Sequence, residues 1–166
     1  MNTEDQELIN VRKGENFDNS LLREYLLSNL KIKDNNLEIL QFAGGHANLT
    51  YLIKFGTEEF VLRRPPLGPI APSSHDMNRE HKVQSSINKV FPLVPKSLLF
   101  CDDETVIGAK FHIIERRKGH VIRKVMRIDL ENSKEKIRKL SFKMLDIVSD
   151  LHKINPSKIG LGDLGK

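Results

Sequence analysis

Two short β-type segments separated by a six-residue loop constrain the fold of this chain more than any other feature. The segments are Leu37 to Phe42 and Leu49 to Phe55, and the loop at 43–48 contains two adjacent glycines. A third segment, 60–63, ends on Arg63. Glycine lets the main chain approach phosphate oxygens without a Cβ in the way, and a cation on a nearby strand can reach the same phosphates. The pattern therefore predicts a nucleotide-phosphate site at this loop.

Paired glycines between strands also occur in ordinary hairpins and bulges, which is the commoner meaning of such a loop. The helix that follows favours the phosphate interpretation. Residues 76–88 have helical spacing, with Met77, Val83 and Ile87 on one apolar stripe. Glu80 falls on the same stripe. A carboxylate beside a core is costly unless it is paired. We therefore predict that Glu80 pairs with Arg63. The alternative is that Glu80 lies at a solvated helix edge.

Several segments of the chain are similar, in order and spacing, to one known family; they are 42–51, 60–66, 79–81, 94–95, 111–115, 151–152 and 159–165. Over about 36–166 the sequence resembles the aminoglycoside phosphotransferase-like kinases, a family that includes choline kinase-like proteins. Within it, the sequence resembles the branch fused to, or encoded beside, acyl-CoA dehydrogenases. The resemblance implies ATP and Mg²⁺ as cofactors and transfer of the γ-phosphoryl group to a small-molecule hydroxyl, with a hydroxyacyl-CoA among the acceptors.

The fold that this resemblance implies is α+β: a protein kinase-like small lobe, with a five-stranded antiparallel sheet and one packed helix. The last two strands are expected at 97–101 and 110–115. We expect an N-terminal extension at 1–35, the nucleotide-binding small lobe and hinge at 36–118, and the beginning of an incomplete large lobe at 119–166.

The N-terminal extension is predicted to contain one helix. It is capped by Asp18 or Ser20 and reaches about Leu30. Residues 1–17 are polar and are expected to be loose. The turn between the second and third strands is expected at 56–59.

A long C-terminal helix is expected from about 133 to 153, where Asn132 and Glu135 resemble a capping box. If its apolar stripe is left in water, it favours self-association, unless the small lobe or a missing C-terminal lobe covers it. The glycine-rich tail at 160–165 is expected to hold no single conformation. The stripe comprises Ile137, Leu140, Met144, Ile147, Val148 and Leu151.

The resemblance also implies a nucleotide site built from strand, helix, hinge and loop. Arg63 takes the position of the ATP-binding lysine, and Glu80 is its partner. Glu115 and Arg117 contact adenine through their backbones at the hinge, and Ile114 lies beside the ring. The loop that covers the phosphates comprises Gly44, Gly45, His46, Ala47 and Asn48.

The catalytic loop of the family, His-Gly-Asp followed by a metal-binding asparagine, does not occur in the 166 residues. We therefore assign no catalytic residue and no metal ligand in this chain, and we expect the magnesium ligands in the missing lobe. The chain alone is expected to be inactive. The alternative function is a non-catalytic kinase-like binding or interaction module. A His-Gly-Asp segment encoded in frame or nearby would favour the split or truncated kinase.

Composition bears on compartment and partners. The single Cys101 excludes an internal disulfide framework and suits a cytoplasmic protein, and the polar, acidic N-terminus is not a signal peptide. Residues 116–143 carry eleven Lys/Arg and three Asp/Glu in a chain of net charge +5. Such a basic stretch raises a third candidate, an RNA-associated protein. We favour a solvated helix face and a phosphate-attracting hinge, with no nucleic-acid or membrane partner.

Overall fold

A computed structural model of the chain describes residues 8–44, 47–69, 74–119, 122, 130 and 133–164. The chain divides into two compact units, Met1–Arg117 and Lys118–Lys166. Among the helices of the described residues, none combines the length and the apolar character needed to cross a bilayer.

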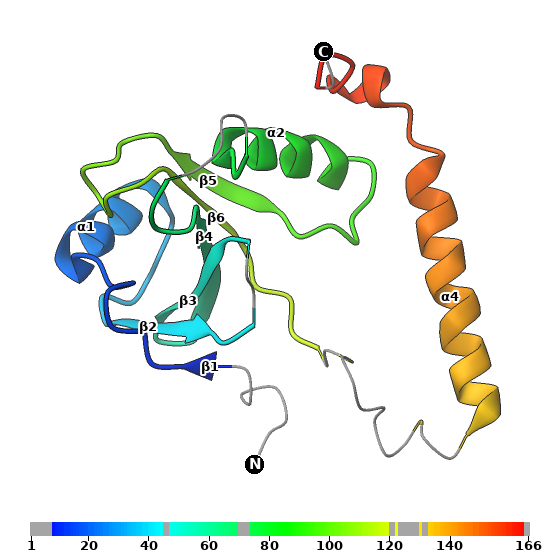
Figure 1. The fold of residues 1–166 in the computed structure, drawn as a ribbon, viewed down its shortest axis with the longest axis horizontal. Helices are drawn as coiled ribbons and strands as arrows, with labels where there is room; N and C mark the ends of the chain where they lie inside the picture. The colour runs from blue at the N-terminus through cyan, green and yellow to red at the C-terminus, as the bar shows by residue number, and fades with distance from the viewer. Residues whose placement is uncertain are drawn as a thin grey trace. The chain divides into compact units, whose positions relative to one another are not determined.

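In the described part of the first unit, six strands form one antiparallel sheet in the order β1-β2-β3-β4-β6-β5 (Figure 1). This confirms the α+β class and corrects the expected number of strands. The additional strand is β1, whose two residues pair with the end of β2 at the sheet edge. A strand this short shows no periodicity, so residues 1–17 were wrongly expected to be loose throughout. The strands are β1 (Leu8–Ile9), β2 (Leu37–Phe42), β3 (Leu49–Phe55), β4 (Glu58–Arg64), β5 (Ser97–Cys101) and β6 (Phe111–Glu115).

The turn between β3 and β4 is tighter than the sequence suggested. Phe55 pairs directly with Glu58, so only Gly56 and Thr57 lie in the turn, and Glu59 also belongs to β4. Gly56 has φ 57°. Two-residue hairpin turns favour such left-handed conformations, which glycine adopts without strain.

The strand register places an apolar row on one face of the sheet. Leu40 pairs with Leu52, Leu52 with Val61, and Val61 with Ile114, so one apolar side chain from each of four strands lies in line. Phe42 lies two residues beyond Leu40 on β2 and therefore faces the same side. This face carries the candidate site.

A polar row runs beside the apolar one on the same face. Arg63 pairs with Thr50 on β3 and with His112 on β6, and each of the three lies two residues from a member of the apolar row. Arg64 follows Arg63 on β4 and therefore faces the opposite side, where it is buried and donates a 2.9 Å hydrogen bond from Nη1 to the Ile107 carbonyl. The two arginines thus serve different faces of the sheet.

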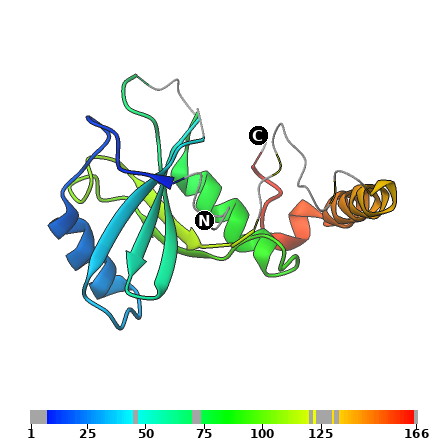
Figure 2. The ribbon, with the colours of Figure 1, turned by 90° about the horizontal axis from the view of Figure 1, so that it is seen from below.

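Helix α1 (Asn19–Asn29) covers the face opposite the apolar row (Figure 2). Asp18 accepts hydrogen bonds from the backbones of Ser20 and Leu21, so it is the cap. Leu22 and Leu26 are fully buried in the main core. The other buried core residues are Tyr51, Ile53, Phe55, Leu62, Cys101, Val106, Ile107, Phe111 and Ile113.

Helix α2 (Met77–Asn88) packs along β5 and β6 (Figure 1). Its cap is Asp76, which accepts from the backbones at positions 78 and 79. Of the predicted apolar stripe, Met77 is buried, whereas Val83 and Ile87 are only half-buried. The stripe therefore seals one side of the sheet only in part, and its polar member Glu80 stays reachable.

The second unit contains α4 (Lys134–His152) and a short 3-10 helix, Pro156–Ile159. Ser133 caps α4 by accepting from the Lys136 backbone, so the cap lies one residue after the predicted Asn132, which is outside the described residues. Five apolar side chains of α4 are exposed. Phe142 and Leu145, which the predicted stripe omitted, are among them, with Leu140, Met144 and Val148.

The tail after α4 has more local structure than the sequence suggested. Gly160 has φ 76° and closes the 3-10 helix, and the backbone of Leu161 donates to the Pro156 carbonyl at 2.9 Å. The Leu161 side chain is buried. A left-handed glycine that caps a helix uses its conformational freedom for one specific geometry, which the composition alone does not indicate.

Candidate functional site

The predicted ion pair between β4 and α2 is present. Arg63 Nε lies 3.1 Å from Glu80 Oε2, and the two side chains are 34% and 31% exposed. The alternative, a Glu80 directed only to solvent, is therefore wrong. Because both side chains are about one-third exposed, a ligand can reach them, while the ion pair fixes their positions.

The second oxygen of Glu80 binds the residue that ends the glycine loop. Asn48 donates from Nδ2 to Glu80 Oε1 at 2.7 Å, and Asn48 is only 8% exposed. His75 Nδ1 lies 2.7 Å from Asn48 Oδ1 and must carry the proton there, because an amide oxygen only accepts. His75 has φ 53°, in the left-handed region. The glycine loop, β4 and the start of α2 therefore meet at one carboxylate.

His112 lies beneath this network and was not among the predicted site residues. Its side chain is fully buried, with Nε2 3.7 Å from Glu80 Oε2, and within the described residues neither ring nitrogen has a hydrogen-bond partner. Burial lowers the pKa of His112 to about 4; nearby Glu80 opposes this, and Arg63 adds to it. His112 is therefore neutral at neutral pH. The feature that identifies His112 as a site residue is its pairing with Arg63 across β4 and β6, and only the strand register shows this pairing.

The predicted phosphate loop is described in part. Gly44 and Ala47 are exposed, whereas Asn48 is buried. Gly45 and His46 lie outside the described residues. The structure thus places the two ends of the loop: one follows β2, and the other is held on Glu80 by Asn48.

The predicted hinge begins at the end of β6. Ile114 is buried at the end of the apolar row. The Glu115 N–H donates to the Lys96 carbonyl at 2.8 Å, and its Oε2 lies 3.1 Å from Arg117 Nη2. Arg117 also donates to the Pro92 carbonyl at 3.0 Å. The side chains of both predicted hinge residues are therefore engaged by neighbours in the first unit.

Metal-binding chemistry has little support in the part of the chain that the structure describes. No three His, Cys, Asp or Glu side chains come together there in a way that could hold an ion. Both oxygens of Glu80 accept a hydrogen bond, one from Asn48 and the other from Arg63.

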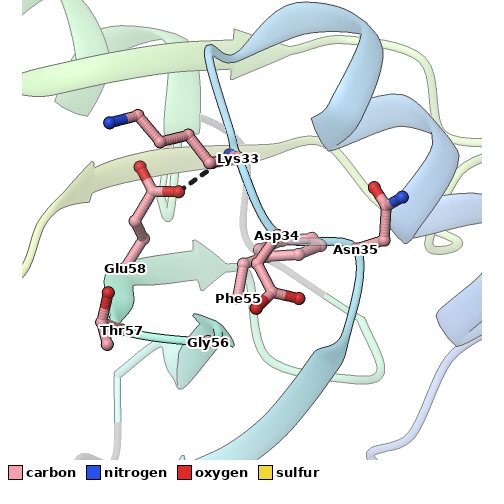
Figure 3. A pocket seen from close by; sticks show the side chains of 7 residues that line it. All are labelled: Lys33, Asp34, Asn35, Phe55, Gly56, Thr57 and Glu58. Atoms are coloured by element: carbon pink, nitrogen blue, oxygen red, sulfur yellow. Dashed lines mark hydrogen bonds between the residues drawn. The ribbon is translucent and has the colours of Figure 1, made fainter.

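A hollow of about 510 Å³ lies elsewhere, at the hairpin between β3 and β4 (Figure 3). The register puts this hairpin at the opposite end of both strands from Asn48 and Arg63. Its two carboxylates accept backbone hydrogen bonds, Asp34 from Asn36 and Glu58 from Lys33. We therefore treat the hollow as part of the hairpin structure and not as the functional site.

An antiparallel sheet with a strand arginine held by a helix glutamate, next to an apolar row that ends at a hinge, is the arrangement of a kinase-like nucleotide lobe. The model of the family described as the phosphotransferase enzyme family matches residues 38–166. This chain belongs to that family.

Individual relatives agree with this assignment. The chain is 29% identical over 167 residues to acyl-CoA dehydrogenase family member 11 of Pongo abelii, covering 98% of this chain and 21% of that protein. It is 33% identical over 125 residues to the Homo sapiens protein of the same name, covering 73% of this chain and 16% of that protein. The chain therefore spans about a fifth or less of these relatives.

A solved structure shows the same fold. A candidate aminoglycoside phosphotransferase from Ralstonia eutropha superposes with a TM-score of 0.70 at 25% identity. The match covers 91% of this chain and 43% of the Ralstonia chain. The predicted resemblance to aminoglycoside phosphotransferase-like kinases, including the branch that is associated with acyl-CoA dehydrogenases, is confirmed.

Proposed function

We propose that this chain is the nucleotide-binding part of an ATP-dependent phosphotransferase, which transfers the γ-phosphoryl group to a hydroxyl of a small molecule. The observation that carries the proposal is the 3.1 Å contact between Arg63 Nε and Glu80. Within the described residues Arg63 donates to Glu80 through Nε alone, so its two terminal guanidinium nitrogens can face phosphate oxygens. A planar guanidinium with two parallel donors suits bidentate phosphate binding.

The apolar row supplies a surface for the base. Val61 and Ile114 are cross-strand partners, 8% and 9% exposed, and lie directly beside the row that holds Arg63. Sequence reasoning selected Ile114 and missed Val61, which only the register brings next to it. Since the Glu115 N–H is taken by Lys96, a base contact by Glu115 must use the carbonyl oxygen. A carbonyl acceptor followed by the Arg117 N–H complements the amino donor and ring acceptor of adenine.

This chain contributes positioning and charge to the reaction. Phosphoryl transfer depends mostly on holding the nucleotide in line with the acceptor and on compensating the charge on the phosphates. Arg63, oriented by Glu80, and the backbone of the glycine loop serve these purposes. Mg²⁺ accompanies ATP in such reactions, but the described residues offer it no carboxylate cluster, so we assign it no ligand in this chain.

For the acceptor, we propose a hydroxyl-bearing acyl-CoA as the first compound to test. The relatives in acyl-CoA dehydrogenase families support this choice by their names. Other alcohols, including choline and aminoglycosides, are the comparison compounds, because the family assignment alone does not distinguish among acceptors.

A second function is a kinase-like module that binds nucleotide without catalysis. The observation that favours it is that the contacts described above, Arg63 and Asn48 on Glu80, can bind and orient a nucleotide, which is all that such a module needs. Incubation of the chain with ATP-Mg and each acceptor in a coupled ADP-release assay separates the two functions. We expect no turnover by this chain alone; turnover would show that residues other than the expected aspartate support the reaction.

Nucleotide binding itself is tested by isothermal titration calorimetry with ATP-Mg. Arg63→Met keeps the bulk of the side chain and removes its charge, and should weaken ATP binding by about tenfold or more, as expected for loss of a charged hydrogen bond. Lys54→Met is the matched control, since Lys54 also forms an ion pair on this sheet, 2.7 Å from Glu38. Equal ATP affinity of the wild type and Arg63→Met would contradict the proposed site.

A further inference from the structure

The end of β2 and the hinge are joined by a cation–π contact that the proposed function does not use. The guanidinium carbon of Arg116 lies 5.0 Å from the centre of the Phe42 ring. Phe42 is the last residue of β2 before the glycine loop, and Arg116 follows β6 between the two hinge residues. The contact therefore joins the end of β2, just before the glycine loop, to the predicted hinge.

The shielding of one guanidinium nitrogen of the half-buried Arg116 distinguishes this contact from a loose surface pair. Its Nε is shielded from solvent and has no hydrogen-bond partner within the described residues, and its Nη1 donates to the Arg117 carbonyl at 3.2 Å. A shielded donor without a partner is unfavourable. The face of the Phe42 ring is the group that compensates, since an aromatic face attracts a guanidinium.

The ring of Phe42 is also suitably placed to stack on a base. Phe42 belongs to the same sheet face as the apolar row, and by position on β2 it lies level with the row of Thr50 and Arg63. A nucleotide whose base touches Val61 and Ile114 and whose phosphates reach Arg63 therefore lies on the same sheet face as this ring. Aromatic rings stack on nucleobases, and a planar guanidinium competes for the same ring face.

Building on the proposed function, we propose that Arg116 is an internal competitor for the nucleotide base. Its guanidinium covers the face of Phe42 on which the base stacks, and nucleotide binding displaces it. Arg116 therefore lowers the affinity for nucleotide and keeps the ring face of Phe42 covered while no nucleotide is bound. It is not a catalytic residue.

The test uses adenosine, titrated into the 166-residue chain and followed by NMR. Adenosine carries the base without phosphates, so removing a positive charge has little direct effect on its binding. Arg116→Gln should tighten adenosine binding by about fivefold, which is the range expected for release of a partly desolvated cation–π contact. ATP-Mg is titrated in parallel.

Two further variants isolate the mechanism. Arg138→Gln is the matched control, because Arg138 also stacks on a ring, that of Phe142 at 5.4 Å on α4, and neither residue is assigned to the nucleotide. It should leave adenosine binding unchanged. Phe42→Leu should weaken adenosine binding, and Arg116→Gln should then have no further effect in the Phe42→Leu background, since the effects of contacting residues are not additive.

The outcomes separate this inference from the proposed function. If wild type binds nucleotide and Arg116→Gln binds adenosine no more tightly, the competitor role is overturned and the nucleotide site stands. If neither wild type nor any variant binds adenosine or ATP-Mg, both are overturned. An Arg116 Nε–H signal that is protected from exchange in the free wild type and loses its protection when adenosine is added supports displacement.

Discussion

Asn48 donates a 2.7 Å hydrogen bond to Glu80, which ties the end of the glycine loop to helix α2. Glu80 has two oxygens and divides them between this amide and the Arg63 guanidinium. The position of the loop is thereby coupled to the cation that reaches the phosphates. A change at Asn48 should be felt at Arg63, although the two side chains share only this carboxylate.

We expect Asn48→Ala to lower the free energy of unfolding by about 1–3 kcal/mol, since it removes the partner of a carboxylate oxygen and of the His75 ring at a buried position. Urea denaturation followed by circular dichroism measures this. Asn78→Ala, an exposed site on α2, is the control and should change stability little. Equal midpoints for the two variants would show that the Asn48 hydrogen bonds contribute nothing net.

The stability of the fold should depend on pH through His112. Burial lowers its pKa from 6.5 to about 4 in the folded chain, so the unfolded chain holds the additional proton between these values. The contribution is therefore fully present above pH 6.5 and is lost as the pH falls toward 4, by about 3 kcal/mol in all. Measuring unfolding free energies from pH 7 to pH 4 gives the slope.

His112→Phe should flatten this slope, because it removes the titrating group and two buried nitrogens without partners in the described residues. Some slope should persist, since burial also lowers the pKa of His81. His152→Gln at the exposed end of α4 is the control and should leave the slope as in wild type. A slope unchanged by His112→Phe would contradict the assignment.

The hairpin between β3 and β4 should be sensitive at Gly56. A Cβ there would collide with the Asp34 carboxylate, and φ 57° is strained for any residue with a side chain (Figure 3). We expect Gly56→Ala to lower the free energy of unfolding by about 1–3 kcal/mol. Gly119→Ala, where a Cβ meets nothing within 4 Å, should have little effect. Thermal unfolding of both variants decides, and similar melting temperatures would argue against strain at Gly56.

We expect the chain to self-associate through α4 unless the small lobe or a further lobe covers this helix. Leu140 and Met144 are 37% and 60% exposed, within a larger set of exposed apolar side chains on this helix. Replacing both with Glu should make the chain monomeric in sedimentation velocity and leave the sheet folded. Lys143→Glu changes the net charge by the same amount and should leave association intact. A wild-type chain that is already monomeric, with α4 open to hydrogen exchange, would refute this expectation.

The sequence predicts the central strands well because their length and composition are local properties. The bounds expected for β2, β3 and β5 are those of the structure. It fails where pairing decides: β1 is too short to show a pattern, and the extent of β4 depends on Phe55 meeting Glu58 across the turn. Hydrogen bonds between strands depend on two segments together, so they cannot be predicted from the residues of either segment alone.

The candidate site divides in the same way. Arg63 and Glu80 could be predicted, because a carboxylate on an apolar stripe needs a partner and a strand ending on a cation precedes it. His112 and His75 could not. One is placed by the β4–β6 register, and the other by a left-handed backbone just before the α2 cap. Their roles depend on contacts between segments that are far apart in the sequence.

Adjacent arginines on β4 make the length of this strand as important as its composition. Arg63 faces α2 and Arg64 is buried on the other side, so a single-residue deletion before them would exchange every side chain that follows between the two faces. It would turn Arg63 toward the α1 core and withdraw it from the glutamate at once. The effects of substitutions in β4 can therefore range from small to large, whereas any single-residue insertion or deletion there disrupts both faces. Among functional relatives we expect substitutions in this strand but no change in its length.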